Sequence, residues 1–327
     1  MIKKVWLAAV ATLFLGHACG GEEPAPASET SSAIDTGSSD ARSRFAGAWG
    51  LARIERRDAD GELTTEPIED RLGYIMYDTT GHMGVTLMRP DREPYSEDGP
   101  TADEALAQLG SYTSYFGRYT VNEAEGFVTH HLEGTVSPGG AGTDAQRFYT
   151  FEDGRLILQP PPAEDGSRSF ITWERFPDLP EEELTDTHRR LFGFYRIEAV
   201  SRETSDGESM EAEQYDAGYI IYAPSGHMSV HLMRPDRQPY AGDEPTAEEA
   251  QAAVQSYASY FGPFSVHETE GYLVHHRIGN EDPAGTDTDA QRFYELTDTH
   301  LMLRPPPTVD DEGRELQSTI RWMRVTE

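Results

Sequence analysis

The sequence has little of three things on which many functional classes depend: cysteine, basic charge and long apolar runs. Cys19 is the only cysteine among 327 residues, which excludes an intramolecular disulfide framework and any multi-cysteine metal cluster. The only lysines are Lys3 and Lys4, and 58 acidic against 27 basic residues give a formal charge of -31. Such a polyanion repels phosphate backbones and anionic lipid headgroups. We therefore expect no nucleic-acid partner, no metal and no cofactor.

The N-terminus carries an export signal. The basic residues at Lys3 and Lys4 are followed by an apolar run, Val5 to Leu15, and by Gly16-His17-Ala18-Cys19. This order is that of a secretory signal peptide, and the run is too short to span a bilayer permanently. The position of Cys19 resembles a bacterial lipobox, although Gly16 stands where a bulky aliphatic residue is usual. We expect an exported protein whose partner is the bacterial membrane, through a lipid on Cys19 at the outer membrane or in the periplasm. The alternative is an ordinary signal cut and a secreted product.

The rest of the chain contains one unit twice, with an offset of 145 residues. Gly81-His82-Met83 recurs as Gly226-His227-Met228, Leu87 to Arg92 as Leu232 to Arg237, Ser114 to Gly117 as Ser259 to Gly262, His130-His131 as His275-His276, and Asp144 to Tyr149 as Asp289 to Tyr294. A unit of this length is a domain in its own right and not a solenoid repeat.

These features predict five segments of the chain. Residues 1–18 are the signal peptide, and residues 19–43 form a disordered acidic tether, because they contain almost no large apolar side chain that could build a core. Residues 44–177 and 189–327 are the two domains, and residues 178–188 link them.

Each unit is a series of short strands cut by glycine-containing turns, such as Thr80-Gly81 and Glu125-Gly126. The strands predicted in the first unit are 48–57, 72–78, 82–89, 118–122, 127–134, 145–151, 155–159 and 168–175. A capping box at Thr101 and Glu104 starts one helix, whose apolar spacing continues to Gly117. The second unit repeats this helix from Thr246 to Gly262, and we expect each helix to cover its barrel. The fold class is all-β, with two tandem up-and-down barrels of about eight strands and one inserted helix each.

Several motifs together resemble a known family. Gly47-Ala48-Trp49 resembles the Gly-x-Trp opening of lipocalins. The motifs that follow in order, around Gly81, Leu87, Tyr115, Thr129 and Gln146, are similar to those of the bacterial and fungal lipocalin-like domain family. The second unit departs from this pattern at its start, where Gly193-Phe194-Tyr195 replaces the tryptophan motif. The resemblance implies a small β-barrel with a mouth and an internal cavity, but it implies no reaction.

Candidate ligand-binding side chains occur at the same places in both units. The strand from His82 alternates between a face of His, Gly, Thr and Met, which suits a partly polar cavity, and an aliphatic face that suits packing. Arg147 lies in an otherwise apolar strand, so it either pairs with an acid, Asp144 or Glu174, or holds a ligand oxygen. The predicted ligand contacts are His82, Tyr112, Tyr115, His131, Arg147, His227, Tyr257, Tyr260, His276 and Arg292.

Other interpretations of the same residues remain open. His130 and His131 are adjacent in a strand, so they point to opposite sides and cannot chelate one metal together. The tyrosines can be core and rim packing, and the segment from Arg89 to Arg92 can be a loop held by Arg–Asp pairing.

Three functions are compatible with these residues. The leading hypothesis is a non-enzymatic protein that binds small apolar or amphipathic molecules in one or both barrels. The second is a cofactor-independent isomerase or cyclase of polyketide- or terpene-like substrates, with a histidine as base and Arg147 or Tyr115 stabilising an oxyanion. The third is a protein-interaction module of the cell envelope that uses the barrels as solid scaffolds.

Overall fold

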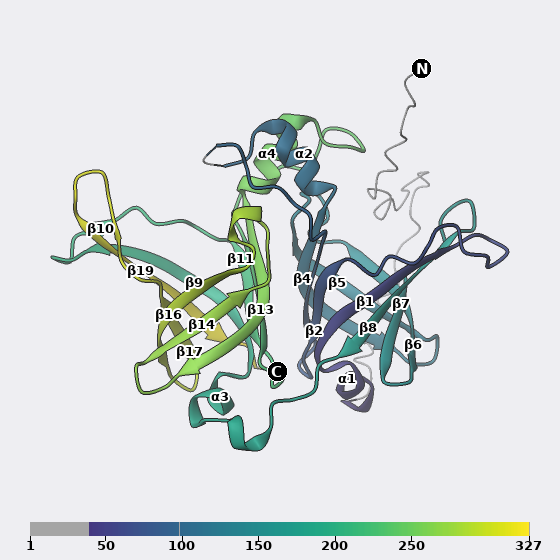
Figure 1. The fold of residues 1–327 in the computed structure, drawn as a ribbon, viewed down its shortest axis with the longest axis horizontal. Helices are drawn as coiled ribbons and strands as arrows, with labels where there is room; N and C mark the ends of the chain where they lie inside the picture. Colours follow the sequence, from purple (N-terminus) through teal and green to yellow (C-terminus); the bar gives the residue numbers. More distant parts are fainter. Residues whose placement is uncertain (1–38, 98, 327) are drawn as a thin grey trace, which may run out of the picture.

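The protein forms two β-barrels that stand side by side (Figure 1). The computed structural model describes residues 39–97 and 99–326. The first barrel closes through strand order β1 to β8, and the second closes because β9 pairs with β19. Both closing pairs are antiparallel. The predicted all-β fold of two tandem up-and-down barrels is therefore confirmed.

The first barrel is built from consecutive neighbours along the chain. Its elements are α1 (Ser39–Phe45), β1 (Gly47–Arg57), β2 (Leu72–Tyr77), β3 (His82–Met88), α2 (Ala102–Leu109), β4 (Tyr112–Asn122), β5 (Phe127–Thr135), β6 (Asp144–Glu152), β7 (Arg155–Gln159) and β8 (Arg168–Arg175).

The second barrel repeats this order, with a few short additions. Its barrel strands are β9 (Gly193–Thr204), β11 (Ala217–Tyr222), β12 (His227–Met233), β13 (Tyr257–His267), β14 (Tyr272–Arg277), β16 (Thr288–Leu296), β17 (His300–Arg304) and β19 (Glu315–Arg324). Helix α3 (Asp186–Leu191) precedes its first strand as α1 does, and α4 (Ala247–Gln255) repeats α2. The additions are the short helices η1 (Glu181–Glu183) and η2 (Pro283–Gly285) and the strands β10 (Ser209–Met210), β15 (Gly279–Asn280) and β18 (Thr308–Val309).

The predicted strands of the first unit match the observed ones closely, apart from β4. The turns between them use glycine as predicted, since Gly81 and Gly126 have φ of 93° and 72°. Strand β4 begins at Tyr112, although the apolar spacing predicted a helix that continues through Tyr112 to Gly117. Tyr112 and Phe116 are four residues apart, which fits a helix, but they are also in phase along a strand. Helix α2 ends at Leu109, with Gly110 as its C-cap.

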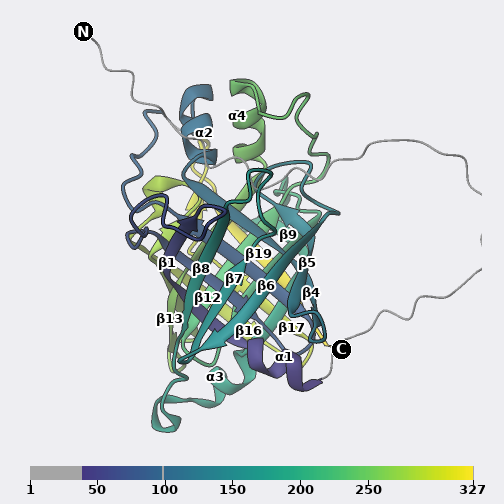
Figure 2. The same ribbon diagram turned by 90° about the vertical axis from the view of Figure 1, so that its right-hand side faces the viewer.

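The helices α2 and α4 do not cover the barrels, contrary to the prediction from the sequence. They pack against each other above the junction of the two barrels (Figures 1 and 2), through Ala105, Leu109, Ala250 and Val254. The predicted capping boxes at Thr101 and Thr246 are both present.

Helix α1 closes one end of the first barrel. Phe45 is buried among barrel side chains, and the Trp49 indole donates a hydrogen bond to the Phe45 carbonyl at 2.8 Å. The tether predicted for residues 19–43 therefore ends too late, because Ser39 to Phe45 is helical. The predicted signal peptide and Cys19 lie outside the described residues. No helix within the described part of the chain is long and apolar enough to cross a bilayer.

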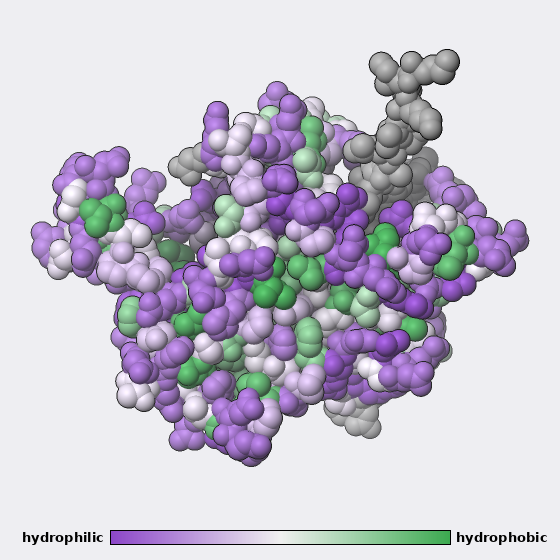
Figure 3. Space-filling model, viewed as in Figure 1, coloured by the Kyte–Doolittle hydropathy of each residue, from purple (hydrophilic) through white to green (hydrophobic). Residues whose placement is uncertain are grey.

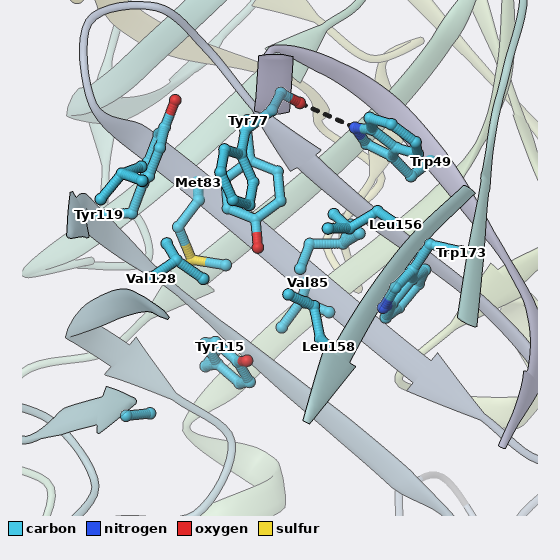
Figure 4. Packing of buried hydrophobic residues seen from close by; sticks show 14 of the residues in the cluster. Trp49, Tyr77, Met83, Val85, Tyr115, Tyr119, Val128, Leu156, Leu158 and Trp173 are labelled. Carbon is cyan, nitrogen blue, oxygen red and sulfur yellow. Dashed lines mark hydrogen bonds between the residues drawn. The ribbon is translucent and has the colours of Figure 1, made fainter. Parts of the chain in front are cut away.

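The core of the first barrel follows from strand alternation. Met83 and Val85 of β3 point inward and pack with Trp49, Tyr119 and Trp173 (Figure 4). In the second barrel, Met228 and Val230 of β12 take the corresponding positions. The aliphatic face of this strand is thus the packing face, as predicted.

The mixed face of the same strand lies outside the barrel, between the two barrels, and not in a cavity. Thr86 and Ser114 on the first barrel face His231 and Tyr257 on the second, with Ser114 Oγ 3.0 Å from His231 Nδ1 and 3.1 Å from the Tyr257 hydroxyl. The strands β2–β4 and β11–β13 bury a shared apolar cluster that includes Phe116 and its repeat equivalent Phe261. Ser114, His231 and Tyr257 therefore pair across the interface, whereas Ser229 Oγ and His231 Nε2 on the same face are buried without a hydrogen-bond partner among the described residues.

Two arginines from equivalent loops fasten this interface. Arg92 donates to the carbonyls of Asn280 and Glu281, and Arg237 donates to those of Thr135 and Val136. The sequence favoured a loop held by Arg–Asp pairing. The structure instead directs both guanidinium groups across the junction to main-chain oxygens of the other barrel.

Hydrophobic residues are visible in the middle of the surface, over the region where the barrels meet, and in smaller groups over both barrels (Figure 3). Most of the visible surface is hydrophilic, in keeping with the acidic composition. The two barrels therefore form one unit whose apolar side is turned inward.

Replacing Arg237 by alanine should lower the free energy of unfolding by about 2–4 kcal/mol, because three buried carbonyls, those of Thr135, Val136 and Ala253, lose a charged donor. Chemical denaturation measures this change. The matched control is Arg189→Ala, which removes two exposed ion pairs, with Glu181 and Asp186, and should cost less than about 1 kcal/mol. Equal losses in the two variants would show that the arginine does not hold the barrels together.

Candidate functional site

A histidine held between two tyrosines lies in the interior of the first barrel. His130 is 0% exposed, and its Nε2 and Nδ1 atoms lie 2.8 Å and 3.0 Å from the hydroxyls of Tyr77 and Tyr115. Val128, His130 and Leu132 alternate on the inner face of β5, which turns the imidazole into the apolar core.

The imidazole in this position is neutral. Burial lowers the pKa of His130 well below its ordinary value, and the nearby Arg147 guanidinium lowers it further. A neutral imidazole donates through one nitrogen and accepts through the other. One tyrosine hydroxyl therefore donates to His130 and the other accepts from it. The accepting hydroxyl keeps its own proton for another partner.

Arg147 adds a positive charge to this group. Its Nη1 donates to the Gln146 carbonyl at 2.8 Å, and its guanidinium hydrogen-bonds the Tyr115 hydroxyl. None of the ion pairs among the described residues includes Arg147. The predicted acid partners are engaged elsewhere, since Asp144 lies 2.7 Å from His131 and Glu174 lies 2.5 Å from Arg155.

The Trp173 indole provides an unused donor in the same barrel core. Trp173 is 1% exposed, and its Nε1 atom has no hydrogen-bond partner among the described residues. Figure 4 shows the side chains of Tyr77, Tyr115 and Trp173 turned into the same barrel interior. A buried N–H without an acceptor costs about 1–3 kcal/mol. Arg147 and Trp173 together are therefore donors that an acceptor group of a ligand would satisfy.

The second barrel contains the same arrangement. His275 lies 2.8 Å and 2.9 Å from the hydroxyls of Tyr222 and Tyr260. Arg292 Nη1 donates to the Gln291 carbonyl at 2.8 Å, and the buried Trp322 indole also has no partner among the described residues. We call these groups the barrel 1 cluster (Tyr77, Tyr115, His130, Arg147 and Trp173) and the barrel 2 cluster (Tyr222, Tyr260, His275, Arg292 and Trp322).

Helix α1 covers one end of barrel 1, and no helix of the described chain covers the opposite end, which we call the open end (Figures 1 and 2). Partly buried inward-facing side chains occur along the whole barrel. Leu51, Leu87 and Ile171 are among them, and so are Tyr149 and Phe151, which pack on Phe45 of α1.

The ten predicted ligand contacts fall into three places. Those in the barrel interiors are Tyr115, Arg147, Tyr260 and Arg292. Those between the barrels or beside the linker are His82, Tyr112, His227 and Tyr257. Those on the outer walls are His131 and His276, which pair with Asp144 and Asp289. Ligand contact by these residues stays a prediction, and only the first group lies within the clusters.

The choice of His131 and His276 over their neighbours needs correction, because His130 and His275 are the inward-facing members of each pair. The signal was present in the sequence. Val128 and Leu132 are in phase with His130, whereas Thr129 and Glu133 are in phase with His131. Tyr77, Trp173 and their equivalents were also missed, since a lone tyrosine or tryptophan in an apolar strand resembles ordinary core.

Two surface hollows lie apart from both clusters. One of about 220 Å³ is lined by Phe148, Gln159, Pro160, Pro162 and Arg168. The other, of about 230 Å³, is lined by Arg189, Arg190, Thr297, Asp298 and Arg324. Neither hollow is lined by a residue of the barrel 1 cluster or the barrel 2 cluster.

The repeated barrel, its Gly-x-Trp opening and the order of its elements agree with a match to the model of the lipocalin-like domain over residues 46–176 and 192–325. The chain belongs to the lipocalin-like domain family. The family resemblance stated from the motifs is thereby confirmed for both units, including the second, which lacks the opening tryptophan.

Among solved structures, this tandem lipocalin-like protein is similar to three at low identity. Bovine odorant-binding protein in complex with a selenium-containing odorant is 12% identical, with a TM-score of 0.24. The match covers 46% of this chain and 79% of the odorant-binding protein. A protein of unknown function from Nostoc punctiforme is 11% identical, with coverage of 88% and 98% and a TM-score of 0.23. Transferrin binding protein B from Neisseria meningitidis is 7% identical, with coverage of 85% and 76% and a TM-score of 0.21. Among curated proteins, none matches the sequence.

The buried imidazole between the lipocalin-like domains should make stability depend on pH. Burial lowers the pKa of His231 to about 3, whereas the unfolded chain takes up this proton near pH 6.5. Between these values the unfolded state binds more protons, so the free energy of unfolding falls as pH falls, by up to about 1.4 kcal/mol per pH unit.

The variant His231→Thr tests this dependence, because Thr86 is the repeat equivalent of His231 in the first domain. Urea denaturation between about pH 6 and pH 4 should show a shallower loss of stability in the variant than in the parent protein. Identical pH dependence in the two proteins would mean that His231 is protonated in the folded state.

Proposed function

We propose that the protein binds small amphipathic molecules inside its barrels, with the polar end of the molecule at the clusters. The observation that carries this proposal is the repetition, at equivalent places in both barrels, of a guanidinium outside every ion pair of the described residues and an indole N–H without a partner among them. A buried indole N–H without an acceptor is costly, and a ligand oxygen would relieve that cost. The apolar tail would lie against the partly exposed inner residues toward the open end.

The groups in each cluster define the chemistry of the polar end. Arg147 and Trp173 can only donate, so the ligand atom that meets them must accept, as a carbonyl, hydroxyl, ether or carboxylate oxygen does. Burial raises the pKa of Tyr115, so its hydroxyl stays protonated at neutral pH and adds no negative charge to the site. The site therefore selects molecules with an acceptor at one end and an apolar body.

A catalytic function is less well supported by the same geometry. A histidine base needs a free ring nitrogen that can reach a substrate proton. Both nitrogens of His130 are already within hydrogen-bonding distance of tyrosine hydroxyls, as are both nitrogens of His275. Ligand binding would use the arginine and indole donors, which lie outside the histidine–tyrosine hydrogen bonds. An isomerase or cyclase with a histidine base would first have to break one of those hydrogen bonds.

The double variant Arg147→Met, Arg292→Met tests the proposal. A dansyl-labelled long-chain methyl ester should bind the parent protein and bind the variant about tenfold or more weakly, because a charged donor to a buried oxygen contributes about 1.5–3 kcal/mol. Fluorescence titration measures both affinities.

The matched control for this titration is the double variant His131→Ala, His276→Ala, which removes paired side chains from the outer walls and should leave the affinity unchanged. Absence of probe binding to the parent protein, or equal binding by the arginine variant, would refute binding at the clusters.

We further propose that the protein is exported and anchored to the bacterial envelope by a lipid on Cys19. The basic residues, apolar run and cysteine of the first nineteen positions support this location. The variant Cys19→Ser should move the protein from the membrane fraction to the soluble fraction. It should also abolish incorporation of an alkyne-labelled fatty acid in a bacterial host. Retention of the label by the variant would place the lipid elsewhere, and absence of label from the parent protein would leave a simple secreted product.

A further inference from the structure

The barrel 2 cluster differs from the barrel 1 cluster by one additional guanidinium. Arg277 occupies the position that Leu132 holds in the first barrel, since the two residues are 145 positions apart and each ends the inward row of its strand. Leu132 belongs to the apolar core of barrel 1. The substitution therefore places a charge where the other barrel has only hydrocarbon.

Arg277 joins the polar groups of the barrel 2 cluster. Its guanidinium carbon lies 5.8 Å from the ring centre of Tyr260, and its Nη2 donates to Thr288 Oγ at 2.6 Å. The Arg277 and Arg292 guanidinium groups are near enough to repel each other, and both act electrostatically on His275. The exposed carboxylates of Asp282 and Asp289 act on Arg277 in the opposite sense, but neither forms an ion pair with it among the described residues. On β16, Ala290 pairs with His275 of β14 and lies between Thr288, the partner of Arg277, and Arg292.

The positive charge of this pair is not neutralised by a direct ion pair. None of the ion pairs among residues 39–97 and 99–326 includes Arg277 or Arg292. Within the same ranges, the Nε atom of Arg277 is buried without a hydrogen-bond partner, and so is the indole N–H of Trp322. Two like charges side by side in a barrel interior are unfavourable unless an anion lies between them.

We propose that barrel 2 binds the anionic head of an amphiphile, a carboxylate on an apolar chain, between Arg277 and Arg292, whereas barrel 1 binds uncharged amphiphiles. This inference rests on the proposed function, because it assigns ligand classes to the two binding barrels. Two guanidinium forks match the oxygens of a carboxylate geometrically as well as electrostatically. In barrel 1 the single Arg147 is shared with Tyr115 and the Gln146 carbonyl, and Leu132 offers no second contact.

The arginines at the open end of barrel 1 do not reverse this assignment. Arg71 stands near Arg56 and Arg89, but also near Asp70 and Asp91. None of the charged groups that act on Arg71 belongs to the barrel 1 cluster, whereas Arg277 and Arg292 both act on His275 of the barrel 2 cluster.

The experiment compares two probes that differ only in charge: a dansyl-labelled long-chain carboxylic acid and its methyl ester. Titration of the full chain should show one site that prefers the acid by about tenfold or more, as expected for a paired, desolvated charge. The variant Arg277→Leu, which copies barrel 1, should remove this preference. The variant Arg277→Lys keeps the charge and should retain part of the preference for the acid. The reciprocal variant Leu132→Arg should create a second site that prefers the acid.

The matched control is Arg304→Leu, which removes the same charge from the outer side of β17 in the same barrel. The control should keep the full preference, and circular dichroism shows whether each variant is folded. If both probes bind but Arg277→Leu leaves their ratio unchanged, the inference is wrong and the proposed function stands. If neither probe binds the parent protein, both are wrong.

Discussion

The structure depends on how an apolar barrel accommodates polar side chains that it cannot expose to water. In each barrel a histidine uses both of its nitrogens on two tyrosines, so that three polar groups satisfy one another at distances of 2.8–3.0 Å. This mutual pairing removes the histidine from further contacts and fixes its neutral form. The groups left over are the arginine and the tryptophan, and they give the interior its capacity to recognise another molecule.

Duplication of the domain solves a second problem of burial. The outer face of β2–β4 carries too many apolar and uncharged polar side chains to remain in water, and the same face on β11–β13 covers it. Arg92 and Arg237 complete the junction by reaching main-chain oxygens of the opposite barrel. The two halves nevertheless differ at single positions. Thr86 against His231 is one example at the junction, and Leu132 against Arg277 is one in the interior.

The sequence was sufficient for features that depend on neighbouring residues. Strand bounds, glycine turns, capping boxes and the family followed from local patterns, and β7 and β8 were predicted to the residue. It was insufficient where one spacing fits two structures, as for Tyr112 and Phe116, which are in phase in both a helix and a strand. It was also insufficient for the junction, since the partner of the His82 face lies more than one hundred residues away and only the folded arrangement reveals it. The inward histidine could have been chosen correctly, because Val128 and Leu132 mark the inner face of β5.

The central claim is that ligands bind inside the barrels, at the arginine and tryptophan donors of each cluster. A crystal structure of the full chain with a bromine-labelled long-chain carboxylic acid tests this claim most directly, because the anomalous signal locates the chain and the density locates the head. We expect the carboxylate beside Arg277, Arg292 and the Trp322 indole, with the bromine toward the end of barrel 2 that lies opposite α3. A molecule found between the barrels or on the outer walls near Phe148 or Phe293, with the interior donors still unpaired, would contradict it.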